Sequence, residues 1–145
     1  DRPATGLEGK FSMPFCAAAA VVHGRVGIDT FEPGALNDSN VRSVMSRVTM
    51  RVDPSFDGAA PPLTQSRVTI RLRDGRTLTQ MSKGARGYPD QPASDDELAT
   101  KFRVCASRVL SEAAAERALT TLRRIEAIND MRELTANLAA DRTLG

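Results

Sequence analysis

The most apolar stretch of the chain lies near its start, between Gly9 and Gly24, and has the sequence GKFSMPFCAAAAVVHG. Its apolar run, from Phe11 to Val22, is much shorter than the roughly 20 residues that a membrane span needs. A secretory signal needs a basic segment before its apolar run, whereas the mixed-charge segment DRPATGLEGK precedes this one. The run therefore predicts a buried helix of a folded domain, and neither a membrane segment nor a targeting segment.

Residues at both ends of the run bound the predicted helix. Ser12 can accept a hydrogen bond as the N-cap, and Pro14 is tolerated in the first turn because its missing N–H costs little there. Gly24 suits the C-terminal cap, and His23 lies at the negative end of the helix dipole. The run is apolar nearly all round, which predicts burial on more than one side.

The middle of the chain alternates apolar and polar residues. A short helix capped by Asn37 or Asp38 comes first, and the similar strings SRVTMRVD (46–53) and SRVTIRLRD (66–74) follow. Period-two alternation with Thr and Arg on the second face is typical of half-buried antiparallel strands. A proline-containing loop, 54–65, separates the two strings.

A turn signal follows the second string. Asp74-Gly75 lies between two β-rich runs, which predicts a hairpin with a return strand over 76–81. Together with 46–53, these segments predict an antiparallel sheet of three or more strands.

The last third of the chain has helical signals. Ser94-Asp95-Asp96-Glu97 forms a capping box, and an apolar face repeats at helical spacing after it. The residues of that face are Leu98, Phe102, Cys105 and Val109. Further helices are predicted from about 112 to 128 and around 131–138. The fold class is α+β, with a two-layer α+β domain over 1–95 and C-terminal helices over 96–145.

Charge and composition exclude several functions. The chain of 145 residues has 20 basic and 18 acidic side chains, a balance that does not favour nucleic acid or an anionic membrane as a partner. Cys16 and Cys105 lie in apolar runs without CxxC spacing, so we expect buried thiols and a cytoplasmic protein. With one histidine and two cysteines, no metal site and no cofactor are predicted.

Three features could still contribute chemistry. Arginines on the two alternating strings could attract a carboxylate or phosphate, or could simply form a solvated strand face. They are Arg47, Arg51, Arg67, Arg71 and Arg73. His23 could be a general acid or base, although the sequence identifies no acidic partner. The loop KGARGYPDQP (83–92) could bind an anion, but it lacks a nucleotide-binding motif, and a connecting loop is the default.

Three segments, taken in order, resemble the C-terminal part of the MmgE/PrpD family. They are EGKFSMPFCAAAAVVHG, VTIRLRDGRTLTQ and GYPDQPASDDELATKFRVCAS. They match the family's KFS-type motif with a following aromatic, its exposed Asp-Gly turn, and its Pro-containing loop before an EL-x-x-KF helix. The resemblance spans about residues 5 to 110. The family includes 2-methylcitrate dehydratase, cis-aconitate decarboxylase and iminodisuccinate epimerase.

The resemblance implies a two-domain enzyme for small di- or tricarboxylates. Most catalytic residues of such enzymes lie in a large helical domain, and a smaller α+β lid domain closes the cleft. This chain, which begins with Asp1 rather than Met, is similar to the lid plus final helices that return to the helical domain. We therefore expect a domain fragment that is inactive alone, within a homodimeric, 2-methylcitrate dehydratase-like lyase of propionate catabolism.

The resemblance also indicates where substrate would approach this chain. In some members the aromatic of the FS-x-x-aromatic motif is a tyrosine that lines the pocket, and here it is Phe15, which has no hydroxyl. Lys10, Ser12 and Phe15 are the candidate pocket residues, and no catalytic residue is assigned. Alternatives are a cis-aconitate decarboxylase-like or iminodisuccinate epimerase-like parent, or a non-catalytic assembly or binding domain.

Overall fold

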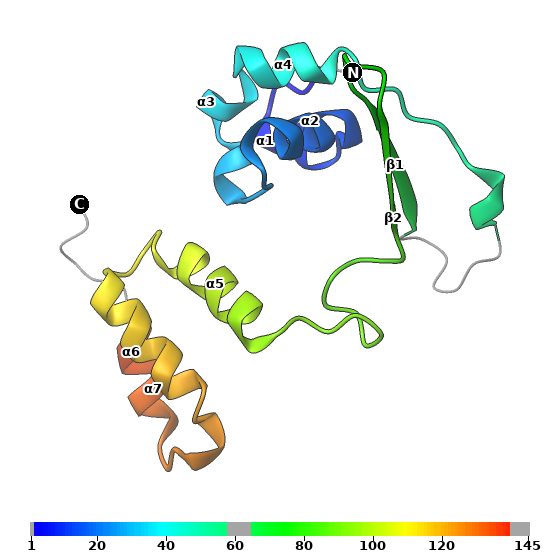
Figure 1. Cartoon of the computed structure of the whole chain (residues 1–145). Helices are drawn as coiled ribbons and strands as arrows, with labels where there is room; N and C mark the ends of the chain where they lie inside the picture. Colours follow the sequence, from blue (N-terminus) through cyan, green and yellow to red (C-terminus); the bar gives the residue numbers. More distant parts are fainter. Residues whose placement is uncertain (1, 58–64, 140–145) are drawn as a thin grey trace. The chain divides into compact units, whose positions relative to one another are not determined.

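A computed structural model describes residues 2–57 and 65–139 of the chain. The chain divides into two compact units, Asp1–Asp57 and Gly58–Gly145, and each is described by itself (Figure 1). The α+β class is confirmed, since helices occur in both units and an antiparallel sheet in the second. The units separate near residue 57, whereas the sequence placed a boundary at 95/96. We still predict that residues 96–145 return to a helical domain of a longer protein.

Short helices make up the first unit. Its elements are α1 (Gly6–Lys10), α2 (Met13–His23), η1 (Ile28–Phe31), α3 (Pro33–Leu36), α4 (Ser39–Met45) and η2 (Pro54–Phe56). The predicted ends of α2 are confirmed. The Ser12 hydroxyl accepts a hydrogen bond from the Phe15 N–H at 3.3 Å. Gly24 has a left-handed φ of 73° and donates its N–H to the Ala20 carbonyl at 2.9 Å.

The core of the first unit forms where α2 packs against α4. Phe15, Ala18 and Ala19 on α2 are fully buried, and the alanines let the neighbouring helix approach closely. Their buried partners in this core are Leu36, Val41 and Met45. Burial on several sides of α2 was predicted, but only one side is covered in this unit.

The predicted strand over 46–53 is wrong. The segment follows α4 and has no regular strand structure. In it, Met50 and Val52 are 69 % and 91 % exposed. Alternation tells which side chains would share a face of a strand. It does not supply the neighbouring strand whose N–H and C=O groups hold a strand in place. Most of the predicted loop that follows, 58–64, lies outside the described residues.

The hairpin is confirmed, as β1 (Ser66–Arg71) paired with β2 (Thr77–Ser82). In its turn the Gly75 N–H donates to the Leu72 carbonyl at 3.2 Å, and Gly75 has a φ of 89°, which favours glycine. Two expectations fail for the described residues. The sheet has two strands instead of three or more, and both strands are exposed on both faces instead of half-buried.

The helical part of the second unit contains α5 (Asp95–Ala106), α6 (Glu112–Leu122), η3 (Ile125–Ala127) and α7 (Met131–Asn137). Helix α6 ends before the predicted residue 128. The side of α5 that packs on α6 uses Phe102, Ala106 and the following Leu110. Of the predicted apolar face, Phe102 takes part in this contact, whereas Ala106 on the adjacent stripe is the buried residue of α5 there. The predicted members Leu98 and Val109 are each 54 % exposed, and Cys105 is also exposed.

Helix α5 begins with the predicted capping box. The Glu97 carboxylate accepts hydrogen bonds from the Ser94 N–H at 2.7 Å and from Arg86 of the preceding loop, whose Nε lies 2.9 Å away. The Ser94 hydroxyl accepts from the Glu97 N–H at 3.3 Å. The loop 83–92 is thereby tied to the start of the helix.

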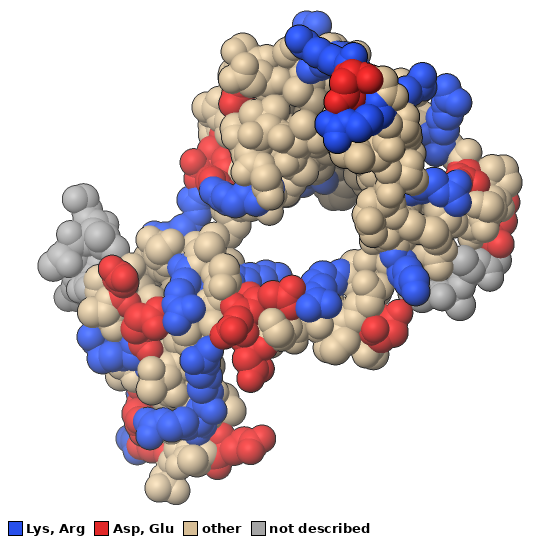
Figure 2. All heavy atoms as spheres, in the orientation of Figure 1, with Lys and Arg blue, Asp and Glu red and all other residues tan. Residues whose placement is uncertain are grey.

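The surface is of mixed charge. Over the helices of the second unit, acidic and basic side chains are interspersed on the face shown in Figure 2. Across the described ranges, no helix is long and apolar enough to cross a membrane.

Substitution of Gly6 should destabilise the first unit. A Cβ at Gly6 would overlap the backbone carbonyl oxygen of Phe31, whereas a Cβ at Gly34 would meet no atom within 4 Å. We expect Gly6→Ala to lower the free energy of unfolding by about 1–3 kcal/mol. We expect the control, Gly34→Ala, to leave it unchanged or raise it by up to ~1 kcal/mol.

Hydrogen exchange of the α2 amides measures this difference, since the chain has no Trp and its only Tyr lies in the second unit. Equal protection of α2 in both variants would contradict the close approach of α1 to η1.

Acid should weaken the start of α5. The hydrogen bonds from Arg86 and Ser94 lower the pKa of Glu97 from its ordinary 4.5 to about 2. A lowered folded-state pKa gives stability that is fully present above about pH 4.5 and is lost as the pH falls toward 2. We expect Glu97→Gln to remove this part of the pH dependence of the melting temperature. Glu126→Gln, a control at another exposed carboxylate, should retain it, and identical profiles for the two variants would contradict the assignment.

Candidate functional site

The predicted pocket residues lie at the junction of α1 and α2, but their side chains have different surroundings. Lys10 is exposed, and its Nζ lies 6.0 Å from the centre of the Phe31 ring. Ser12 is buried and caps α2. Between them, Phe11 is 84 % exposed. Of the motif residues before α2, Lys10 and Phe11 are therefore the ones whose side chains are exposed.

Phe15 lies inside the core of the first unit. Its side chain is fully buried, and its ring centre lies 6.2 Å from that of Phe31 at an interplanar angle of 51°. In this unit Phe15 holds α2 against its neighbours. The roles of Lys10, Ser12 and Phe15 at a substrate pocket stay predictions.

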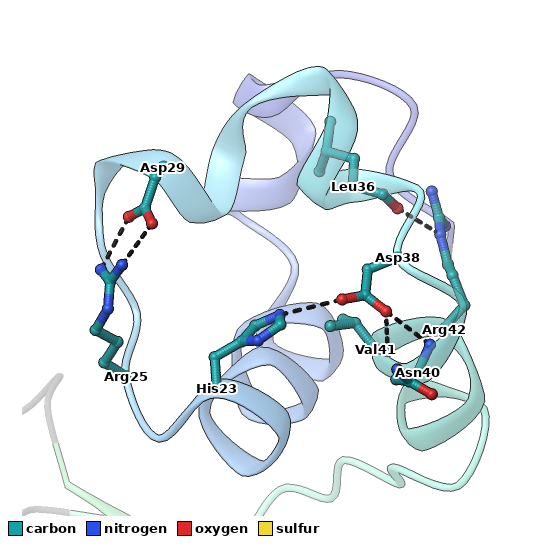
Figure 3. A network of polar contacts seen from close by, with 8 residues as sticks. All are labelled: His23, Arg25, Asp29, Leu36, Asp38, Asn40, Val41 and Arg42. Atoms are coloured by element: carbon teal, nitrogen blue, oxygen red, sulfur yellow. Dashed lines mark hydrogen bonds and ion pairs between the residues drawn. The ribbon is translucent and has the colours of Figure 1, made fainter.

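His23 has an acidic neighbour that the sequence did not identify. Its Nε2 lies 3.4 Å from Oδ2 of Asp38, and the other oxygen, Oδ1, accepts the Asn40 N–H at 2.7 Å and the Val41 N–H at 3.3 Å (Figure 3). The N-terminus of α4 thus fixes a carboxylate that can orient the imidazole. Their side chains are 42 % and 25 % exposed, so the pair is open to solvent.

A second ion pair near this network is structural. Arg25 binds Asp29 with two parallel hydrogen bonds of 2.9 Å and 2.5 Å, which lower the pKa of the Asp29 carboxyl (Figure 3). Both side chains are at least half exposed. The pair links the residues that follow α2 to η1.

A groove of about 760 Å³ opens beside the start of α2 and the end of α4. Its lining residues are Arg2, Pro3, Ala4, Pro14, Asn37, Arg42, Met45, Ser46 and Val48. Two of them are arginines and none is acidic, so the groove favours an anion. These residues come from separate segments of the sequence. The alternating strings indicated other arginines as candidates, and neither Arg2 nor Arg42 was among them.

The remaining candidate groups are the Cys16 thiol, possible metal ligands and the arginines of the alternating strings. Burial raises the pKa of the Cys16 thiol, which disfavours the reactive thiolate, and its Sγ lies 3.5 Å from the Gly9 carbonyl oxygen. Among residues 2–57 and 65–139, no cluster of three or more His, Cys, Asp or Glu side chains could hold a metal ion. Arg67 and Arg71 lie on exposed strand β1.

The sequence matches the model of the MmgE/PrpD C-terminal domain over residues 1–127. The chain belongs to the MmgE/PrpD family. This confirms the resemblance that the KFS motif, the Asp-Gly turn and the EL-x-x-KF helix indicated.

Three curated relatives extend this result. The chain is 30 % identical to the cis-aconitate decarboxylase-like protein oryM of Aspergillus oryzae (strain ATCC 42149 / RIB 40), over 97 % of its own length and 29 % of that protein. It is 27 % identical to the cis-aconitate decarboxylases of Mus musculus and Homo sapiens, over 92 % and 94 % of its length. These alignments cover 27 % and 28 % of the two mammalian proteins. The chain therefore spans less than a third of the length of these relatives.

Proposed function

We propose that this chain is the substrate-capping C-terminal domain of a lyase that decarboxylates a small tricarboxylate such as cis-aconitate. The main support is the match to the MmgE/PrpD C-terminal domain over 1–127, together with relatives named as cis-aconitate decarboxylases. The sequence alone favoured a 2-methylcitrate dehydratase-like reaction. The names of these relatives move our proposal from loss of water to loss of CO2.

The proposed reaction sets clear chemical requirements. A C–C bond to one carboxylate breaks and CO2 leaves, and the electron pair left on carbon takes up one proton, so no oxidant or reductant is consumed. The site must hold the remaining carboxylates with cations or hydrogen-bond donors, supply a proton, and exclude water.

The first unit offers groups for the binding part of this task. The exposed ammonium of Lys10 and the arginine-lined groove can attract carboxylates, and Phe11 offers an exposed apolar surface. Phe15 has no hydroxyl and therefore cannot donate a proton. We place the proton-transfer groups in the part of the longer protein that this chain lacks, and we propose that the protein works as a cytoplasmic homodimer.

Two other functions remain as competing hypotheses. An iminodisuccinate epimerase-like enzyme would remove a proton and return it to the opposite face of the same carbon, without release of CO2. A non-catalytic parent would bind or assemble through this domain and would turn over neither kind of substrate.

An activity assay on a longer and a shorter protein tests the proposal. We expect this chain alone to release no CO2 from cis-aconitate, because it would lack the proton-transfer groups. A protein that joins the chain to its upstream region should release CO2 with uptake of one proton per turnover, measured by gas-phase mass spectrometry and a pH indicator. Turnover by the chain alone would contradict the capping role, and a longer, folded protein without CO2 release would contradict the decarboxylase.

A further inference from the structure

Arg42 is held in a fixed position beside the groove of the first unit. Its Nε donates to the Leu36 carbonyl at 2.7 Å, and its Nη2 donates to the Pro3 carbonyl at 2.8 Å (Figure 3 shows the bond to Leu36). These acceptors belong to α3 and to the segment before α1, which lie far apart in sequence. Because both bonds orient the planar guanidinium, little side-chain entropy remains to be lost when an anion binds its outer N–H groups.

The charge of Arg42 is not balanced within the groove. The side chain is half-buried, and the structure gives it no ion pair with a carboxylate of the described residues. The second charged residue of the lining, Arg2, is also a cation. A partly desolvated guanidinium without a counter-charge gains from a bound anion, and a carboxylate matches its paired donors.

The other lining residues limit what kind of anion fits. Pro14, Met45 and Val48 give the groove an apolar wall. The Ser46 hydroxyl already donates to the Ser43 carbonyl at 2.9 Å, and the Asn37 amide uses one of its two N–H groups on the Pro33 carbonyl at 3.2 Å. The arginines are therefore the main donors left for a ligand, and the apolar wall suits a short carbon skeleton.

We propose that this groove binds a small di- or tricarboxylate, with Arg42 as the residue that anchors one carboxylate group. Arg2 neutralises a second carboxylate, and the wall formed by Pro14, Met45 and Val48 contacts the carbon chain. The class of ligand rests on the proposed function, whereas the presence of an anion site rests on the groove itself. Binding of a carboxylate to this chain can be measured without turnover. A negative binding result can therefore be distinguished from a failure of the decarboxylase proposal.

The test uses tricarballylate, a saturated tricarboxylate that cannot be decarboxylated in the same way. We expect it to shift the NMR signals of residues 2–4, 37 and 42–48 in the whole chain, with NaCl at equal ionic strength as the reference. Arg42→Gln should weaken binding by about tenfold or more, because it removes a charge-assisted contact. The control Arg47→Gln removes an exposed arginine that does not line the groove, and should change the dissociation constant by less than about twofold.

Further variants keep the test decisive. Arg2→Gln should weaken binding about threefold while leaving the hydrogen bonds of Arg42 to backbone carbonyls in place. If Arg42→Gln does not fold, this variant tests whether the groove binds the anion. Equal losses in Arg42→Gln and Arg47→Gln, or shifts spread over the whole surface, would show non-specific charge attraction and overturn the proposal. Inorganic phosphate that binds as tightly as tricarballylate would contradict a site for a carboxylate on a carbon chain.

Discussion

The close packing of α2 against α4 is the contact on which the first unit depends. Ala18 and Ala19 have too little bulk to keep the helices apart, and Phe15 fills the space beside them with a fully buried ring. Loss of such a ring from a core costs about 3–5 kcal/mol. The same contact brings the C-terminus of α2 to the N-terminus of α4, where His23 meets Asp38. It also presents Arg42, one turn further along α4, to the groove.

The first unit thus separates its structural groups from its accessible ones. Phe15 and Ser12, although they belong to the family motif, hold the beginning of α2 in place. Lys10, Phe11 and the arginine-lined groove remain accessible at that end of the helix. This arrangement supports our proposal that the domain covers a carboxylate substrate while other parts of the enzyme move protons.

Local signals in the sequence predicted local structure well. Three of these signals act through hydrogen bonds within a few residues, so the neighbouring residues are enough to predict them. They are the caps Ser12 and Gly24, the Asp74-Gly75 turn and the Ser94–Glu97 capping box. Segment 46–53 has the right alternation but lacks a paired strand, which no local pattern reveals. On α5 the periodicity gave the helix and one contact residue, Phe102, but it missed Ala106, which is buried on the adjacent stripe.

The candidate site was the least predictable part. Asp38 is a cap by its sequence and becomes the partner of His23 only when α2 and α4 pack together. Arg42 has no distinctive neighbours in sequence, and the carbonyls that fix it come from Leu36 and Pro3. The family, by contrast, was predictable from three short motifs, because their order along the chain is more specific than any one of them.

Our central proposal is that this chain completes a lyase whose substrate loses CO2. The most direct measurement is a competition assay with the longer protein that contains it. Equal concentrations of cis-aconitate and 2-methylcitrate are supplied together, and mass spectrometry follows both. We expect cis-aconitate to be consumed first, with one CO2 released per molecule. Loss of water from 2-methylcitrate, with cis-aconitate left unchanged, would contradict it.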